Sequence, residues 1–283
     1  MTKLTTTFLL LTGLLLSLSL SAQIRTPMPS PTASFEQSLG LTTVSMEYSR
    51  PGVKGRDIFG ELVPYGQIWR TGANAATKIT FGDDVMLEGN PVEAGTYALY
   101  TMPGKGEWTV MLYNDLTLGG NVADYDKEQE YLRFTVEPQA MPMMIESMAF
   151  LIDDIRDDQA TLSLMWAKTM VSMEIKLSTD EQVMASIERV MNGPSANDYF
   201  AAARYYYETD RDMEQALEWI NLTLESTERY WIMTWKARIL GKMERYKEAT
   251  AVSQKAMEMA QEAENMDYVR MNEDMMAEFK AKM

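Results

Sequence analysis

The stretch "TMVSMEIKLSTDEQ", residues 169–182, contains the point at which the chain changes its structural period. In its first part apolar and polar residues alternate, which is typical of a half-buried strand. In its second part Ser178 with Glu181, or Thr179 with Gln182, offers a capping box that begins a helix. We therefore expect an α+β protein with segregated domains, in which an all-β domain precedes Ser178 and an all-α domain follows it.

Strand signals extend from this point back to about residue 34. About nine short strand-like segments occur there, separated by turns such as "PGKGE" and "DDIRDDQ". They contain no long helical pattern, so residues 34–177 are predicted to form an antiparallel β-sandwich. The expected strands are 44–48, 77–81, 85–89, 96–102, 107–113, 131–138, 144–152, 160–167 and 169–177.

Helical signals fill residues 178–283. The first helix is expected to end at the sequence Asn-Gly-Pro of residues 192–194, because glycine and proline commonly terminate helices. Each later helical segment is followed by a short turn. These segments lie near 196–208, 212–226, 228–241, 244–262 and 266–281.

A repeat is visible within the helical region. Ala216 and Ala249 are 33 residues apart, as are Tyr207 and Leu240. This pattern resembles tetratricopeptide-type helical hairpins, although Arg204 stands where a small residue is expected. The resemblance implies a groove for a protein partner. Two hairpins are fewer than the roughly three repeats that such arrays usually need, so we expect this domain to pack on the β domain or to be capped by its last helix.

The N-terminal residues have the pattern of an export signal. Residues 1–22 combine Lys3, a leucine-rich apolar run and small residues before a cleavage site, as a secretory signal peptide does. Residues 23–33 are rich in Pro, Ser and Thr and are expected to be a flexible leader. The protein is therefore expected to be exported and soluble, either periplasmic or extracellular, without a membrane span.

Composition excludes several classes of function. The chain contains no Cys and no His, so Ser-His-Asp and Cys-His catalysis, Cys/His zinc sites and His-ligated haem are closed to it. The formal net charge of −15 argues against binding to nucleic acid or to an anionic membrane surface. Acid–base chemistry would have to use Asp, Glu, Lys or Tyr.

The segment "SRPGVKGRDIFGELVPYGQIWRTGAN", residues 49–74, concentrates positive charge in this acidic chain. Its glycines would let backbone amides approach a ligand, and guanidinium groups suit carboxylates, sulfates and phosphates. The candidate binding residues for an anionic or sugar-like ligand are Arg50, Lys54, Arg56, Trp69, Arg70 and Asn74. The alternative is that the arginines pair with Asp57, Glu61 and Glu93 and hold a long loop on the sandwich.

The same region carries a family resemblance. The strings R-P-x-x-K-G-R, L-V-P-x-G, W-R-T-G-A-N and A-G-T-Y between about residues 33 and 176 resemble domain of unknown function 2911, a family of exported bacterial proteins. The resemblance implies an exported β domain, often with a helical repeat tail. It implies no activity, so no catalytic residue is carried over.

Other candidate sites have weaker patterns. "ADYDKEQE", residues 123–130, could ligate calcium or form a charged edge strand, but lacks the glycine and distal glutamate of an EF-hand loop. Clusters such as "MPMM" could hold Cu(I), although methionine at core-like positions more simply replaces leucine. We therefore assign no metal, cofactor or catalytic residue and expect a non-catalytic binding module of the cell envelope. The alternatives are an envelope polysaccharide hydrolase with paired carboxylates and a purely structural envelope protein.

Overall fold

The computed structural model describes residues 26–191 and 193–283. The predicted signal peptide, residues 1–22, and the start of the leader lie outside the described residues. The chain divides between Ser178 and Thr179 into two compact units, a β domain and a helical domain. The expected fold class, an antiparallel β domain followed by a segregated α domain, is confirmed.

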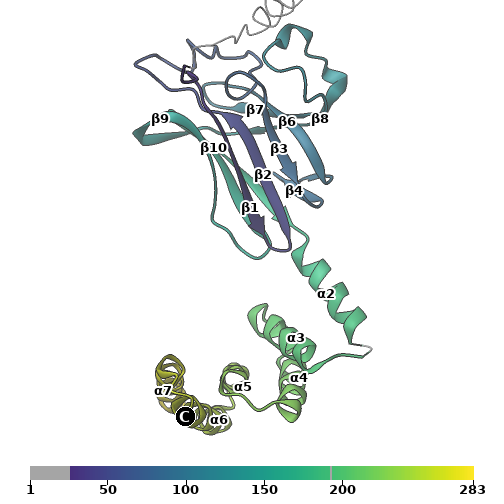
Figure 1. The fold of residues 1–283 in the computed structure, drawn as a ribbon, viewed down its shortest axis with the longest axis vertical. Coiled ribbons are helices and arrows are strands. Elements are labelled where there is room, and N and C mark those ends of the chain that lie inside the picture. Colours follow the sequence, from purple (N-terminus) through teal and green to yellow (C-terminus); the bar gives the residue numbers. More distant parts are fainter. Residues whose placement is uncertain (1–25, 192) are drawn as a thin grey trace, which may run out of the picture. The chain divides into compact units, whose positions relative to one another are not determined.

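The first sheet of the β domain has six antiparallel strands in the order β1-β2-β3-β6-β7-β8 (Figure 1). In β1, β2 and β3 more buried residues alternate with less buried ones, which matches strands with one face on the core. Strand β1, which begins at Thr32 within the expected leader, was not predicted from the sequence. The strands are β1 (Thr32–Leu39), β2 (Thr42–Ser49), β3 (Thr77–Phe81), β6 (Gly95–Met102), β7 (Trp108–Tyr113) and β8 (Glu130–Val136).

The second sheet has the order β5-β4-β10-β9. Short η1 (Val122–Asp124) and η2 (Lys127–Gln129) 3-10 helices lie in the connection before β8. The very short β5 was also missed from the sequence. The strands are β4 (Val85–Leu87), β5 (Asn90–Val92), β9 (Gln139–Asp153) and β10 (Gln159–Leu177).

The long strand β10 folds back on itself. Ser163 Oγ and Ser172 Oγ lie 2.8 Å apart, and the amide of Leu177 donates to the carbonyl of Asp158 at 2.7 Å. A straight strand would separate two residues nine positions apart by roughly 30 Å. The reversal lies at Ala167, whose φ of 53° is the left-handed conformation that such a turn uses. This explains why the sequence indicates two strands here, 160–167 and 169–177.

The core of the β domain lies between the two sheets. Inward-facing residues of both sheets, such as Ile79 and Leu112 on one side and Leu162 and Ile175 on the other, are at most 1% exposed. A smaller apolar cluster lies on the other face of the six-stranded sheet. It consists of Ala76, Ala98, Tyr100, Met111 and Tyr113, with Leu116, Leu118 and Tyr125 from the connection before β8 packed against it.

The helical domain has six helices in the described residues. Ala216 and Ala249, the two alanines 33 residues apart in the sequence repeat, are both fully buried. The likeness to tetratricopeptide hairpins stays a prediction. In the described residues, no helix is long and apolar enough to cross a membrane. The helices are α2 (Thr179–Val190), α3 (Ala196–Glu208), α4 (Met213–Ser226), α5 (Tyr230–Lys242), α6 (Tyr246–Glu262) and α7 (Met266–Ala281).

The first helix of this domain is fixed at its N-terminus. Asp180 accepts a hydrogen bond from the Tyr205 hydroxyl at 2.7 Å and another from the guanidinium of Arg211. The hydrogen bond from Arg211, followed by that from Tyr205, lowers the pKa of Asp180 below its usual value. Both contacts favour the ionised carboxylate, which also suits the positive end of a helix dipole.

Candidate functional site

The first part of the 49–74 loop runs along β9. The amide of Val53 donates to Glu146 O at 2.8 Å, and the amide of Met148 donates to Pro51 O at 3.0 Å. Arg50 adds a side-chain bond, because its Nε donates to Met148 O at 2.9 Å. The loop therefore behaves as an additional edge segment of the second sheet.

Arg56 and Lys54, and also Asn74 at the end of the loop, donate to backbone carbonyls as well. Arg56 donates from Nη2 to Gly52 O at 2.6 Å and from Nε to Val53 O at 3.1 Å. Lys54 Nζ reaches Pro29 O at 3.2 Å. Asn74 Nδ2 contacts Ser30 O at 3.1 Å and Ser49 Oγ at 3.2 Å. Lys54 and Asn74 therefore contact the leader, whereas Arg50 and Arg56 bind the backbone of β9 and of the loop itself.

These contacts support the tether alternative, but with different partners from those expected. Within residues 26–191, none of Asp57, Glu61 and Glu93 lies within 4.0 Å of a loop Lys or Arg nitrogen. Carbonyl oxygens use the hydrogen-bond donors without neutralising the positive charge. These hydrogen bonds thus hold the loop in place, and its positive charge is not neutralised by a carboxylate of these three residues.

Trp69 and Arg70 lie apart from that group and from each other. Trp69 is 8% exposed and belongs to the core between the sheets. Arg70 lies against the outer cluster, where a Cβ at Gly120 would come within 2.7 Å of Arg70 Nη1. Its Nε is buried without a hydrogen-bond partner. The six candidate residues therefore occupy three places: the loop beside β9, the core and the outer face of the sheet.

A hollow with a different set of residues lies at one end of the sandwich. Its volume is about 180 Å³. Its aromatic lining comes from the loop, through Phe59 and Tyr65, and from the start of β7, through Trp108. The remaining lining residues come from three chain reversals and are Gly104, Lys105, Pro138, Gln139, Ala140, Lys168 and Thr169.

Local backbone geometry sets the walls of this hollow. Gly60 has a φ of 103°, and a Cβ there would lie 2.7 Å from the Tyr65 ring, so glycine lets Tyr65 pack against the loop. The fold-back of β10 at Ala167 places Lys168 and Thr169 at a strand tip. Among the lining residues, the Phe59 and Trp108 rings meet edge to face with centroids 4.8 Å apart.

The charge of the lining is positive. Lys105 and Lys168 are exposed, and neither has an ion-pair partner among the described residues. Lys105 Nζ lies 5.9 Å from the centroid of the Tyr65 ring, at the outer limit of a cation–π contact. The lining contains no Asp or Glu. Of the three aromatic lining residues Tyr65 is the exposed one, and together with the two ammonium groups it suits a small ligand that has both a flat face and a negative charge.

These residues were not predicted as a site from the sequence. Phe59 and Tyr65 do lie in the 49–74 loop, but Lys105 lies in "PGKGE", which indicates only a turn. Lys168 is a single lysine between two strands. A basic residue at a turn is so common that only the convergence of the turns in space distinguishes these two.

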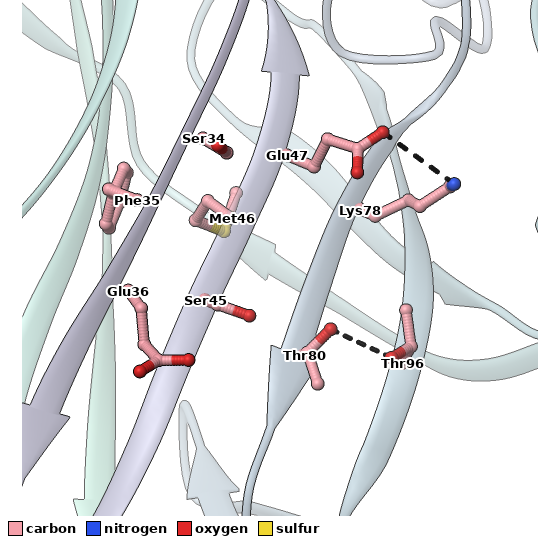
Figure 2. A pocket seen from close by; sticks show the side chains of 9 residues that line it. All are labelled: Ser34, Phe35, Glu36, Ser45, Met46, Glu47, Lys78, Thr80 and Thr96. Atoms are coloured by element: carbon pink, nitrogen blue, oxygen red, sulfur yellow. Dashed lines mark hydrogen bonds and ion pairs between the residues drawn. The ribbon is translucent and has the colours of Figure 1, made fainter.

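A larger hollow of about 470 Å³ lies over β1, β2, β3 and β6 (Figure 2). Its charged and hydroxyl groups largely bind one another: Lys78 pairs with Glu47 at 3.8 Å, and the hydroxyls of Thr80 and Thr96 lie 2.8 Å apart. Phe35 is the aromatic residue in its lining, and the Phe35 ring packs against the core. We interpret this hollow as the solvated outer face of a twisted sheet.

A third hollow, of about 400 Å³, shares Gln139 with the basic one. It is lined by the carboxylates of Glu88, Glu107 and Glu137. Glu88 has a structural role, since its Oε1 accepts from the amide of Glu174 at 2.6 Å. Acidic and basic hollows thus adjoin at the same end of the sandwich.

Carboxylates of the acidic candidate segment, residues 123–130, bind other groups of the protein. In residues 123–130, Asp126 accepts from the amide of Glu128 at 3.0 Å, and Glu130 binds Arg133 through two bonds of 2.6 and 2.7 Å. The bond from Arg133 lowers the pKa of Glu130. In the described part of the chain, no group of three or more His, Cys, Asp and Glu is arranged to hold a metal ion. Of the methionines in "MPMM", Met143 and Met144 are exposed.

Comparison with known proteins identifies the family of the β domain. Residues 30–175 match the family described as "Protein of unknown function (DUF2911)". The chain belongs to this family. The DUF2911 match covers all strands of the β domain up to Ile175 and none of the helical domain. No curated protein and no solved structure matches the chain.

Proposed function

We propose that this DUF2911 protein is a non-catalytic binding module, and that its β domain binds a small anionic, sugar-like ligand at the end of the sandwich. The observation that supports this most directly is the hollow that Lys105 and Lys168 line together with Phe59, Tyr65 and Trp108. The proposal keeps the ligand class expected from the 49–74 loop, but the loop contributes aromatic rings in place of arginines.

The size and chemistry of the hollow define the ligand further. A volume of about 180 Å³ is below the usual range of drug-sized sites, so it fits a single ring. Aromatic rings favour the flatter, less polar face of such a ring, and lysines act as point charges towards a carboxylate or sulfate. A monosaccharide acid, such as a uronate, has both features.

The test is isothermal titration calorimetry of residues 23–283 with glucuronate and galacturonate. Glucose and galactose serve as neutral analogues. We expect the uronates to bind and the neutral sugars to bind at least about tenfold more weakly, because each charge-assisted hydrogen bond contributes about 1.5–3 kcal/mol. Lys105→Ala and Lys168→Ala should each weaken uronate binding by a similar factor.

Lys78→Ala is the matched control. It removes the same charge from the outer face of the six-stranded sheet, where Lys78 pairs with Glu47. Uronate affinity that is unchanged by either hollow variant, or lowered equally by all three, contradicts the proposal. Failure of every sugar and sugar acid to bind at about 10 mM also contradicts it, since a specific site of this kind should bind more tightly than that.

The adjoining carboxylates favour one second candidate, a polysaccharide hydrolase. Glu107 and Glu137 lie beside the basic hollow and could act as a carboxylate pair on a sugar held there. Release of reducing ends from envelope polysaccharide, lost in both Glu107→Gln and Glu137→Gln, would support hydrolysis. Binding of uronates without any release of reducing ends would support the non-catalytic module.

We also propose that the protein is exported, because residues 1–22 have the pattern of a signal peptide. An envelope location would bring the basic hollow to acidic glycans. Mass spectrometry of the protein from its native host should show an N-terminus at about residue 23. An unprocessed chain in the cytoplasmic fraction would contradict this part of the proposal.

A further inference from the structure

Two guanidinium groups flank one indole in the helical domain. Arg204 of α3 lies 4.7 Å from the ring centroid of Trp235, which belongs to α5. Arg238, one turn along α5, lies 4.6 Å from the same centroid. Each contact is a close cation–π interaction, and together they form what we call the Arg–Trp–Arg face: Arg204, Trp235 and Arg238.

The hydrogen-bond donors of these arginines are poorly used. Arg238 Nη2 donates to the thioether of Met271 at 3.0 Å, and sulfur is a weak acceptor. Within residues 193–283, no carboxylate lies within ion-pair distance of Arg238. Arg204 pairs with Glu208 at 3.0 Å on the exposed surface of its own helix, while its Nε is buried without a partner. Such an exposed pair contributes little and is easily exchanged.

The surroundings single out this face from the rest of the helical domain. Residues 179–283 contain 13 Lys and Arg against 20 Asp and Glu, so two arginines on one ring form a local concentration of positive charge in an acidic domain. Two partly buried aromatic rings that pack on the core of the helical domain adjoin the face: Tyr207 lies 5.5 Å from Trp235, and Phe200 lies 5.9 Å from the Arg204 guanidinium. Helix α5, which carries Trp235 and Arg238, contacts both α3 and α7.

We propose that the Arg–Trp–Arg face binds an acidic peptide segment of a partner protein. A carboxylate of the partner would take two parallel hydrogen bonds from Arg238, and Arg204 would exchange Glu208 for a second carboxylate. The apolar part of the segment would cover the indole edge. Charge complementarity is the argument for this occupant, because a basic, aromatic face in an acidic domain attracts the opposite charge. The proposal is independent of the ligand hollow in the β domain.

The experiment uses fluorescence anisotropy of labelled hexaglutamate with the protein of residues 23–283. Labelled hexaglutamine is the neutral comparison. The expected result is binding of hexaglutamate alone, weakened as salt concentration rises and weakened about tenfold by Arg238→Gln. Arg204→Gln should weaken it as well, through a side chain on a different helix.

Arg270→Gln is the matched control. Arg270 is exposed on α7 and pairs with Asp267, so its replacement changes the domain charge equally without touching the face. Equal loss with Arg270→Gln would overturn the proposal, because net charge would then explain the binding. Hexaglutamate binding no tighter than hexaglutamine binding would overturn it too. If Arg238→Gln lowers the unfolding temperature, its weaker binding could reflect unfolding, and the affinity of Arg204→Gln becomes the deciding measurement. Unchanged hexaglutamate affinity of Arg204→Gln would then overturn the proposal.

Discussion

Trp69 and Trp166 stack in the core of the β domain, with ring centroids 5.8 Å apart and ring planes 20° apart. Trp166 belongs to β10, whereas Trp69 belongs to the loop between β2 and β3. The loop is fixed there from both sides, because Trp69 and Thr101 exchange backbone hydrogen bonds of 2.7 and 2.9 Å. Trp69 Nε1 also donates to Gly72 O at 3.0 Å. The 49–74 loop is therefore part of the core as well as part of the surface.

The stacked pair gives the first prediction. Trp69→Ala should destabilise the protein by about 3–5 kcal/mol, because it removes a buried aromatic ring and leaves a cavity beside Trp166. Scanning calorimetry of residues 23–283 measures the change. Leu62→Ala is the control from the same loop, since Leu62 is 44% exposed and its replacement should change stability by less than about 0.5 kcal/mol. Similar effects of the two substitutions would contradict the core role of Trp69.

The turn of β10 gives the second prediction. Ala167 has a φ of 53°, a conformation that is strained by about 1 kcal/mol in residues with a Cβ. Ala167→Gly should therefore leave stability unchanged or raise it by up to about 1 kcal/mol, in spite of the greater freedom of glycine in the unfolded chain. Ala160→Gly, at a buried strand position of β10, should instead lower it by about 1 kcal/mol. Chemical denaturation of both variants provides the comparison, and equal losses would contradict a left-handed turn at Ala167.

Most of the fold could be predicted from the sequence because it rests on local periods. The helices begin and end within a few residues of their expected positions, as with α3 at Ala196–Glu208 and α7 at Met266–Ala281. Capping side chains stand at these starts, Ser195 before α3 and Asn265 before α7. Strand β1 was missed because its residues, "TASFEQSL", are mostly polar, and only their pairing with β2 defines the strand.

The candidate site could be predicted only in part. A loop rich in glycine and arginine is visible in sequence, but whether an arginine faces solvent or a carbonyl depends on distant segments. Arg50, for example, donates to Met148, which is 98 residues away. Neighbouring residues can also separate: Trp69 enters the core while Arg70 lies on the outer face of the sheet. The basic hollow needs three turns to converge, and no local pattern encodes that convergence.

Buried tyrosines give a prediction for alkaline pH. Burial raises the pKa of Tyr100 to about 12, and its hydroxyl donates to Gly119 O at 2.8 Å. The folded state thus binds this proton more tightly than the unfolded chain, whose tyrosines ionise near pH 10. The resulting stability is fully present below about pH 10 and is lost as the pH rises towards 12.

Tyr100→Phe separates this effect from general alkaline damage. At pH 7 the variant should be about 1 kcal/mol less stable, because it loses one buried hydrogen bond and leaves Gly119 O without that donor. Between pH 10 and pH 12 its stability should fall less steeply than that of the wild type. Urea denaturation at pH 7, 10 and 11 measures both effects. If the stability of both proteins falls equally between pH 10 and pH 11, Tyr100 does not contribute to the alkaline transition.

The basic loop itself gives the last prediction. Arg56→Ala should destabilise the β domain by about 1–2 kcal/mol, because the guanidinium donates to two carbonyls, Gly52 O and Val53 O, that fix the course of the loop beside β9. Arg156→Ala is the control: Arg156 pairs with Asp154 in an exposed turn, and its loss should change stability by less than about 0.5 kcal/mol. Calorimetry of residues 23–283 compares them. If Arg56→Ala proves as mild as Arg156→Ala, the carbonyl contacts do not tether the loop. Arg56 would then be free to meet an anion, and a uronate titration of Arg56→Ala would decide between that site and the hollow at Lys105 and Lys168.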